Sequence, residues 1–175
     1  MFEVRIHSRG GQGGVTAARL LALAAVRDGK YATAFPFYGA ERRGAPVVSF
    51  VRIDGSPIRI SSQIRKPDLV IVLDPSVMDV VDVLQGIKPG GRVLVNAREP
   101  RDMGGHPACS VDLTGIALRE KLEVAGSPIL NTAVLGALAK MGIISMESAK
   151  SAIREMFSDP RNVSAAEAAY RELAA

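Results

Sequence analysis

The residues best suited to chemistry form a glycine-rich segment, residues 8–14, which reads Ser-Arg-Gly-Gly-Gln-Gly-Gly. An alternating apolar stretch over 2–7 precedes it, and a helix-like stretch over 15–25 follows. Glycines at a strand-to-helix turn let the backbone approach a ligand closely, and the helix N-terminus offers unpaired N–H groups and partial positive charge. We therefore predict that Gly10, Gly11, Gly13 and Gly14 bind a phosphate or another anion. The alternative is a tight turn that only packs a helix on a strand.

Three further groups could take part in such a site. Arg9 could add a charge-assisted contact to an anion. Gln12 could bond a ligand carbonyl or a neighbouring subunit, or simply face solvent. Arg42 and Arg43 lie between glycines in the segment Tyr-Gly-Ala-Glu-Arg-Arg-Gly, which suits bidentate recognition of phosphate or carboxylate. The competing interpretation of that segment is a solvated charged loop shaped by an ion pair of Glu41.

The motif excludes several common nucleotide sites. The turn reads S-x-G-x-x-G, so it lacks the first glycine of a dinucleotide fingerprint. Phe35, Pro36 and Phe37 stand where an acidic ribose ligand is expected, which disfavours NAD and FAD. No Lys-Ser or Lys-Thr follows the glycines, so the turn is not a P-loop. We find no nucleophile elbow and interpret Asn131 as a helix cap, so we predict no catalytic residue.

Composition narrows the class of protein. The 175 residues suit one domain, 1–175, with a real core. The single cysteine, Cys109, rules out an internal disulfide and a multi-cysteine iron–sulfur or zinc site, so no metal site is predicted. The net charge of +4 comes from scattered residues, which does not indicate nucleic-acid binding. No apolar stretch is long enough for a bilayer and the N-terminus does not resemble a signal peptide, so we expect a cytoplasmic protein with no membrane contact.

Strands and helices alternate along the chain, which predicts an α/β fold: a single doubly wound, mostly parallel sheet with an antiparallel β-hairpin insertion and a helical C-terminal third. The hairpin is expected where Asp54-Gly55 joins strands 47–53 and 57–61. The other expected strands are 2–7, 31–35, 68–73, 92–96 and 109–112. The expected helices are 15–25, 77–84, 114–124, 131–140, 145–157 and 164–173.

Three ordered motifs together resemble one family. They are His7–Gly13, Ala34–Val47, which contains the Glu-Arg-Arg-Gly-Ala-Pro run, and Val51–Asp54. Residues 66–68, 73–75 and 131–137 also match. The chain is thereby similar, over almost its whole length, to the gamma subunit or gamma domain of the 2-oxoacid:ferredoxin oxidoreductases, with pyruvate synthase as the nearest member. Ser8 stands where that family usually has glycine, which leaves the turn less open.

The resemblance implies a function for a complex rather than for the chain alone. Such complexes carry out coenzyme A-dependent oxidative decarboxylation of a 2-oxoacid and reduce ferredoxin. Thiamine diphosphate and iron–sulfur clusters belong to the partner subunits, alpha, beta and delta. The gamma part is expected to pack on the thiamine-diphosphate subunits and to help bind coenzyme A, without activity of its own. Alternatives are the equivalent subunit of an indolepyruvate or branched-chain 2-oxoacid oxidoreductase, or a stand-alone nucleotide-binding protein. Residues 35–38 are the first candidate for a partner-facing apolar surface.

Overall fold

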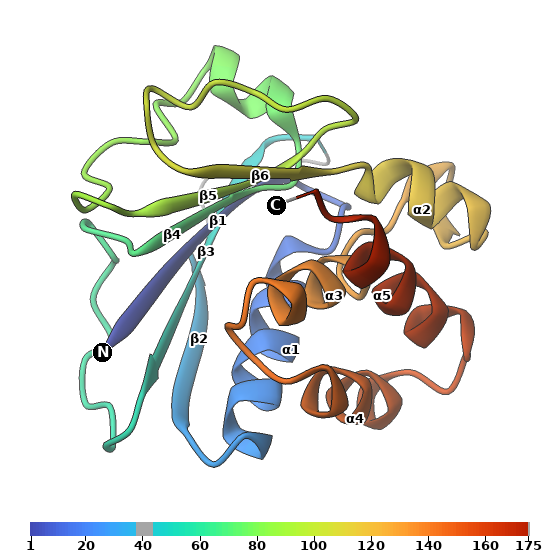
Figure 1. Ribbon diagram of the computed structural model, residues 1–175, viewed down its shortest axis with the longest axis horizontal. Helices are drawn as coiled ribbons and strands as arrows, with labels where there is room; N and C mark the ends of the chain where they lie inside the picture. Colours follow the sequence, from blue (N-terminus) through green and yellow to red (C-terminus); the bar gives the residue numbers. More distant parts are fainter. Residues whose placement is uncertain (38–43, 175) are drawn as a thin grey trace.

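The structure, a computed structural model, describes residues 1–37 and 44–174. Its main feature is a six-stranded sheet with the order β2-β3-β1-β4-β5-β6 (Figure 1). The strands are β1 (Phe2–Arg9), β2 (Tyr31–Phe37), β3 (Pro46–Asp54), β4 (Leu69–Val72), β5 (Arg92–Asn96) and β6 (Ala108–Val111). Strands β1, β4, β5 and β6 are parallel neighbours, whereas β3 is antiparallel to both β1 and β2. The predicted α/β class with a mostly parallel sheet is confirmed.

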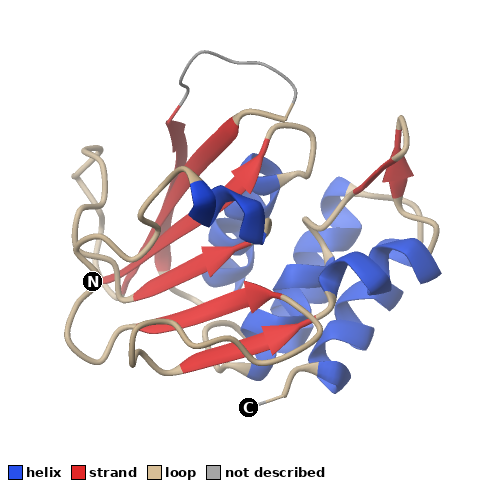
Figure 2. Cartoon of the chain, turned by 90° about the horizontal axis from the view of Figure 1, so that it is seen from above, coloured by secondary structure: helices blue, strands red, loops and turns tan. Residues whose placement is uncertain are grey.

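Helices cover one face of this sheet. They are α1 (Gly14–Arg27), α2 (Leu113–Arg119), α3 (Ala133–Lys140), α4 (Met146–Met156) and α5 (Arg161–Glu172). A 3-10 helix, η1 (Pro75–Asp79), lies on the opposite face from α1 (Figure 2). A small separate ribbon pairs β7 (Glu123–Val124) with β8 (Ser127–Pro128). Because α3, α4 and α5 make up most of the chain after β8, the predicted helical C-terminal third is confirmed.

The antiparallel pair differs from the predicted hairpin. Strand β3 pairs with β2 in the register Phe35↔Phe50, and residues 57–61 form no strand. Pro36 does not end β2, which continues to Phe37, because a proline without an N–H is tolerated on a strand at the edge of a sheet. The Asp54-Gly55 pair marks the end of β3. The antiparallel partner of β3 is β2, which precedes it in the chain, and not the segment that follows the turn.

Three helix predictions were also wrong. The expected helix 114–124 ends at Arg119, and residues 123–124 form β7 instead. The expected helix 77–84 is only the 3-10 helix η1, followed by turns up to residue 86. The last helix begins at Arg161 after Pro160, so Ser164 lies inside it rather than capping it. Proline at or beside the first helical position presets the backbone for a helix start, so the helix begins three residues before the expected start at Ser164.

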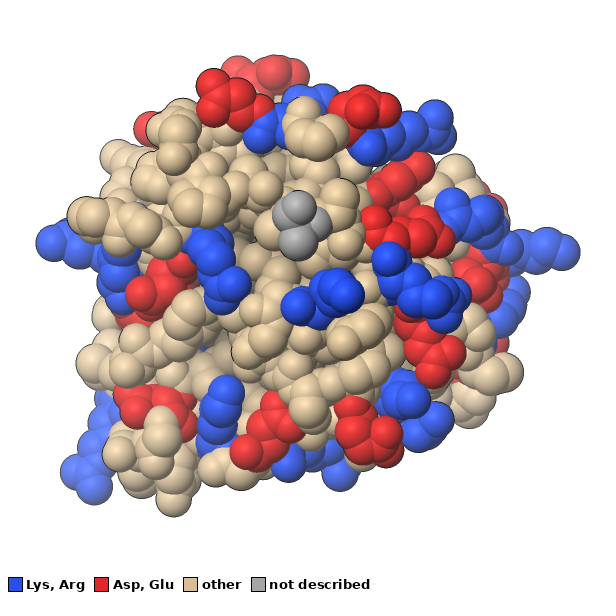
Figure 3. Space-filling model, in the orientation of Figure 1, with Lys and Arg blue, Asp and Glu red and all other residues tan. Residues whose placement is uncertain are grey.

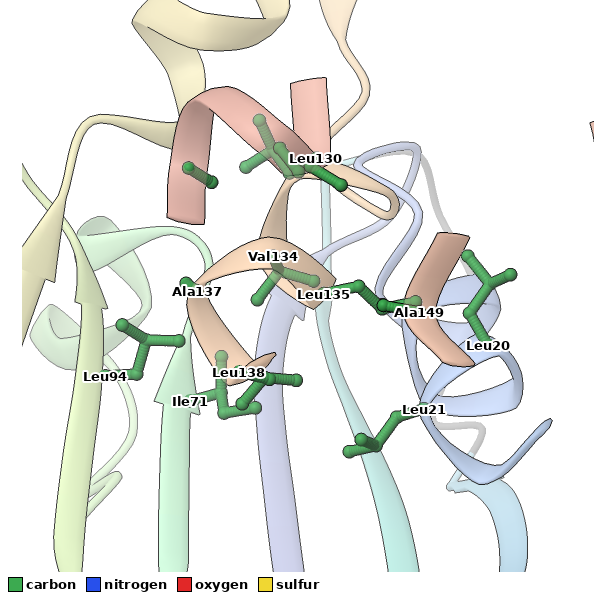
Figure 4. Packing of buried hydrophobic residues seen from close by; sticks show 14 of the residues in the cluster. Leu20, Leu21, Ile71, Leu94, Leu130, Val134, Leu135, Ala137, Leu138 and Ala149 are labelled. Carbon is green, nitrogen blue, oxygen red and sulfur yellow. The ribbon is translucent and has the colours of Figure 1, made fainter. Parts of the chain in front are cut away.

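The core is divided by the sheet. The larger cluster joins Ile6, Ile71 and Leu94 of the strands to the helices, with α3 at its centre (Figure 4). Gly136 of α3 lies so close to α5 that an added Cβ would overlap the carbonyl oxygen of Ala166. The smaller cluster packs β4 and β5 against η1, and includes Val72, Val77 and Val95. Both clusters include residues of β4, and the larger one includes β1; the chain after these two strands forms the site.

Candidate functional site

The glycine turn follows β1, at the place in the sheet where the connections after two neighbouring parallel strands run to opposite faces. After β1 the chain crosses one face as α1, and after β4 it crosses the other face as η1. Between β1 and β4, therefore, the carboxyl ends of neighbouring parallel strands lead to opposite faces and leave a crevice. Ligands of open α/β sheets bind in this position. The turn over 10–13 and Asp74, which follows β4, form the two sides of the crevice.

The turn requires glycine for its conformation and for close packing. Gly11 and Gly13 have φ values of 98° and 86°, which side-chain-bearing residues rarely adopt. At Gly13 an added Cβ would also lie 2.9 Å from the Cβ of Asn131. At Gly14 it would overlap the Ser8 Oγ, so the serine occupies the space beside the first residue of α1. The turn is thus closely packed from both sides.

The backbone amides of the turn divide into two groups. The Gly10 N–H donates to the carbonyl of Ala45 at 2.9 Å, and the Gln12 N–H donates to that of Arg9 at 3.2 Å. The amides with no acceptor among the described residues are those of Gly11, Gly13, Gly14, Val15 and Thr16. All five residues line one cavity of about 320 Å³. Unpaired amides at a helix N-terminus beside an open cavity suit an anion.

The side chains of Gln12 and Arg9 are directed across the crevice rather than into this cavity. Gln12 Nε2 donates to Asp74 Oδ2 at 2.6 Å, while its Oε1 accepts from the Arg9 N–H at 2.8 Å. Arg9 Nε donates to Ser76 Oγ at 2.7 Å, and its Nη1 donates to the Gly44 carbonyl at 2.9 Å. The sequence left open whether Gln12 meets a ligand or solvent, and in this structure it joins β1 to the loop after β4.

Asp74 is the acceptor at the centre of this network. It caps η1 by accepting from the Ser76 N–H at 3.0 Å. Burial alone would raise the pKa of its carboxyl. The hydrogen bonds from Ser76 and Gln12 and the nearby charge of Arg9 outweigh burial, so the pKa lies below its usual value. The carboxylate is therefore ionised at neutral pH and holds the crevice in shape.

Asn131 enters the site from a distant part of the sequence. It is 5% exposed, lines the cavity beside the turn, and its Oδ1 has no partner among the described residues. The neighbouring Leu130 N–H donates to the Gln12 carbonyl at 3.1 Å. The interpretation of Asn131 as a helix cap was wrong: Thr132 precedes α3 and makes no side-chain cap. Spacing along the chain gave no signal for this contact, because Asn131 lies in the last third of the sequence and the turn near its start.

A second hollow of about 280 Å³ lies on the other side of Gln12, at the ends of β4 and β5. Asn96 orders it by donating from Nδ2 to the Leu73 carbonyl at 2.8 Å and to Thr114 Oγ1 at 2.9 Å. Sequence reasoning did not single out Asn96. Its only signal is position, as a polar residue at the end of a buried strand.

Several predictions fall outside what can be placed. Arg42 and Arg43 lie outside the described residues. Within 1–37 and 44–174, no three histidine, cysteine or acidic side chains gather as metal ligands would. No helix in the same ranges is long and apolar enough to cross a bilayer. Charges of both signs are interspersed over the face in Figure 3.

Fold and site together define an α/β protein with a mostly parallel sheet and a glycine-rich turn at the crevice between β1 and β4. A family model described as pyruvate ferredoxin/flavodoxin oxidoreductase matches residues 3–172. The chain belongs to this family. The predicted resemblance is confirmed.

Relatives match along almost the whole chain. The gamma subunit common to the pyruvate/ketoisovalerate oxidoreductases of Thermococcus kodakarensis is 51% identical, covering 98% of this chain and 97% of the relative. Pyruvate synthase subunit PorC of Methanothermobacter thermautotrophicus is 49% identical, covering 99% of this chain and 96% of the relative.

Solved structures agree with the fold. The pyruvate oxidoreductase subunit PORC of Thermotoga maritima superposes with a TM-score of 0.83 at 35% identity, covering 99% of this chain and 97% of that one. The 2-oxoglutarate:ferredoxin oxidoreductase of Magnetococcus marinus contains a region of the same fold, with a TM-score of 0.80 at 20% identity, and this chain covers 30% of its length.

Proposed function

We propose that the chain is a non-catalytic gamma subunit of a 2-oxoacid:ferredoxin oxidoreductase that acts on pyruvate. The observation that carries this proposal is the end-to-end similarity to gamma subunits, at 51% and 49% identity. The single cysteine supports the assignment of iron–sulfur clusters to partner subunits, because such clusters need several thiolates. Alpha, beta and delta subunits would supply the thiamine diphosphate, the clusters and the contact with ferredoxin.

Within that complex, the glycine turn is proposed to receive a phosphate of coenzyme A, whose thiol takes up the acyl group. The residues fit this role because five amides without described partners line one cavity at the N-terminus of α1. Asn131 Oδ1 is a further unpartnered group at the cavity and could accept from a donor on the ligand. Arg9, held by Ser76 and Gly44, would add positive charge beside the turn without leaving its own partners.

The function is tested by assembling the complex with and without this chain. The subunits encoded with it are co-expressed, and pyruvate- and coenzyme A-dependent reduction of ferredoxin is measured. We expect activity only from the assembled complex. Turnover by the isolated chain would contradict a non-catalytic role, and failure of the chain to associate with the other subunits would contradict its role as a subunit.

The coenzyme A site is tested with a charge at the first turn of α1. Thr16→Glu places a carboxylate beside the free amides, where it competes with a phosphate while remaining favourable for the helix. We expect the KM for coenzyme A to rise roughly tenfold, with the KM for pyruvate unchanged. Thr16→Gln is the neutral control of similar size. If both variants keep the KM of the parent complex, the turn serves only to pack α1 on the sheet.

A second candidate rests on the name of one relative, a gamma subunit common to pyruvate and ketoisovalerate oxidoreductases. By analogy, this chain would serve two complexes with different catalytic subunits. A tagged chain isolated from its own cells would then carry two sets of partners. Substrate profiles of the purified material with pyruvate, ketoisovalerate and indolepyruvate distinguish one complex from two.

A further inference from the structure

The two faces of the sheet are covered unequally. On the face away from α1, η1 and residues up to Met103 pack over β4 and β5. Over β1, β3 and β2 the described cover of the same face is the irregular segment 57–66, which reaches it through Ile60 and Ile64, together with residues 81–85 beside Arg5 of β1. A mostly parallel sheet is normally covered on both faces. Within residues 1–37 and 44–174, this half of the sheet lacks a complete second layer.

Three linked hollows occupy that half, with volumes of about 530, 580 and 410 Å³. Gln63 and Arg65 line both the first and the second hollow, and Ile60 lines both the second and the third. We call their union the outer groove. It runs across β1, β3 and β2, and its floor includes Phe35 and Phe50, whose ring centroids lie 5.2 Å apart. Phe37, at the end of β2, is 50% exposed beside it.

Arg5 carries a buried charge into the first hollow. It is 8% exposed and donates from Nη2 to the carbonyls of Val83 at 2.8 Å and Gln85 at 2.7 Å. Its Nε donates to His7 Nε2 at 3.1 Å. Its Nη1 donates to no described residue, and no described carboxylate lies within ion-pair distance of it. Buried charges are usually paired, so this guanidinium has capacity for an acceptor.

Arg52 plays a similar part in the second hollow. Its Nε donates to Glu3 Oε1 at 2.9 Å, and its guanidinium carbon lies 5.6 Å from the Phe35 ring centroid. Its Nη1 makes only a long bond of 3.4 Å to the Ile60 carbonyl, and its Nη2 bonds no described residue. In the third hollow the buried Thr33 Oγ1 also lacks a described partner. The groove therefore offers unpaired donors along its whole length.

The charge of the lining is basic. Arg5, Arg52, Arg59, Arg65 and Lys66 line the outer groove, against the acidic pair Glu3 and Asp82. Glu3 is already engaged by Arg52 and Lys88. Basic donors above an aromatic floor complement a partner with carboxylates beside apolar side chains.

We propose that the outer groove docks a segment of a partner subunit that carries acidic and apolar side chains. This rests on the proposed function, because it assumes that the chain is a subunit of a complex. The segment's carboxylates would accept from Arg5 and Arg52, and its apolar side chains would cover Phe35 and Phe37. A polypeptide fits better than a small molecule, because the hollows continue from one to the next over three strands.

Charge reversal tests the electrostatic part. Arg59→Glu with Arg65→Glu changes two exposed side chains of the groove. Arg154→Glu with Arg171→Glu is the matched control, because it makes the same charge change on α4 and α5, which cover the other face. With all subunits co-expressed, we expect the groove pair to lower the retained chain about tenfold and the control pair to leave it unchanged. Thermal unfolding of each isolated variant confirms that it folds.

The result separates the two proposals. If the parent chain assembles and the groove pair assembles equally well, the docking site is wrong while the proposed function stands. If the parent chain itself fails to assemble, the proposed function is wrong.

Cross-linking identifies the occupant. A photoreactive residue is placed at Ile60, which is 48% exposed in the groove, or at Met156, which is 41% exposed on α4. In the assembled complex we expect position 60 to capture an Asp- or Glu-containing peptide of a partner subunit, and position 156 not to capture that peptide. Capture of a second copy of this chain, or of nothing, at position 60 would overturn the proposal.

Discussion

Gln12 and Asp74 join the two strands that border the crevice, through a bond of 2.6 Å between Nε2 and Oδ2. Because Gln12 Oε1 also accepts from the Arg9 N–H at 2.8 Å, one side chain fixes both the turn and its distance from the loop after β4. Removing it should loosen both. Gln12→Ala is expected to lower the free energy of unfolding by about 1–2 kcal/mol.

Urea unfolding measures that change, and a double-mutant cycle with Asp74→Ala isolates the pair. We expect the two substitutions to be non-additive by about 1 kcal/mol. Gln63→Ala, at an exposed glutamine, is the control and should change stability little. Additive effects of Gln12→Ala and Asp74→Ala would show that the bond does not stabilise the fold.

Gly13 and Gly29 separate two costs of adding a side chain: backbone strain at a positive φ, and steric overlap with a neighbouring residue. Both have positive φ, 86° and 78°, but an added Cβ meets Asn131 only at Gly13 and meets nothing within 4 Å at Gly29. Gly29→Ala should therefore cost only the backbone strain, about 1 kcal/mol. Gly13→Ala should cost more, about 2–4 kcal/mol, because Asn131 must move as well.

Chemical unfolding of both variants gives the difference. The double variant Gly13→Ala with Asn131→Gly removes all three crowding atoms, the Asn131 Cβ, Cγ and Nδ2, and its stability should exceed the value expected from adding the two single changes. Equal losses at Gly13 and Gly29 would contradict close packing between the turn and Asn131.

His7 should make the free energy of unfolding depend on pH, in the range between the pKa of its side chain in the folded chain and that in the unfolded chain. Burial, followed by the charge of Arg5, lowers the pKa of His7 to about 4, although Asp82 opposes this. The unfolded chain binds the proton near the ordinary value of about 6.5, so it takes up more protons than the folded chain between these limits. The stabilisation is fully present above about pH 6.5 and is lost as the pH falls toward 4, by about 3 kcal/mol in all.

His7→Gln keeps an acceptor for Arg5 Nε and removes the titration, so its unfolding free energy should vary less over this range. His106→Gln, in the loop before β6, is the matched control, because it makes the same substitution at the other histidine of the chain. Stability is measured by urea unfolding from about pH 7 down to about pH 4.5. An unchanged slope in His7→Gln would show that another group causes the acid destabilisation.

Local signals in the sequence were sufficient for most of the fold. The glycine segment, the buried run of β4 and the Ser145 cap of α4 each act over a few residues, so their spacing specifies the element. The pairing of β3 was predicted wrongly because Asp54-Gly55 is only a local turn signal, whereas the partner strand is chosen by the sheet as a whole. In the observed pairing Phe35 lies opposite Phe50, with ring centroids 5.2 Å apart, and no spacing rule contains that contact.

In the site, too, residues contiguous in the sequence were predictable and residues from distant elements were not. The turn itself was predictable, since strand, glycines and helix are contiguous. Asn131 and Asp74 were not predictable as members of the site, because they reach it from other elements. Only the family resemblance pointed to segments 73–75 and 131–137, and it gave no contacts.

The glycine turn is fastened on three sides, by Gln12 to Asp74, by Arg9 to Ser76 and by the Leu130 N–H to the Gln12 carbonyl. A segment fixed in advance loses little conformational entropy when a ligand arrives. Subunits that complete the cavity would therefore add contacts to a preorganised cradle rather than create its shape.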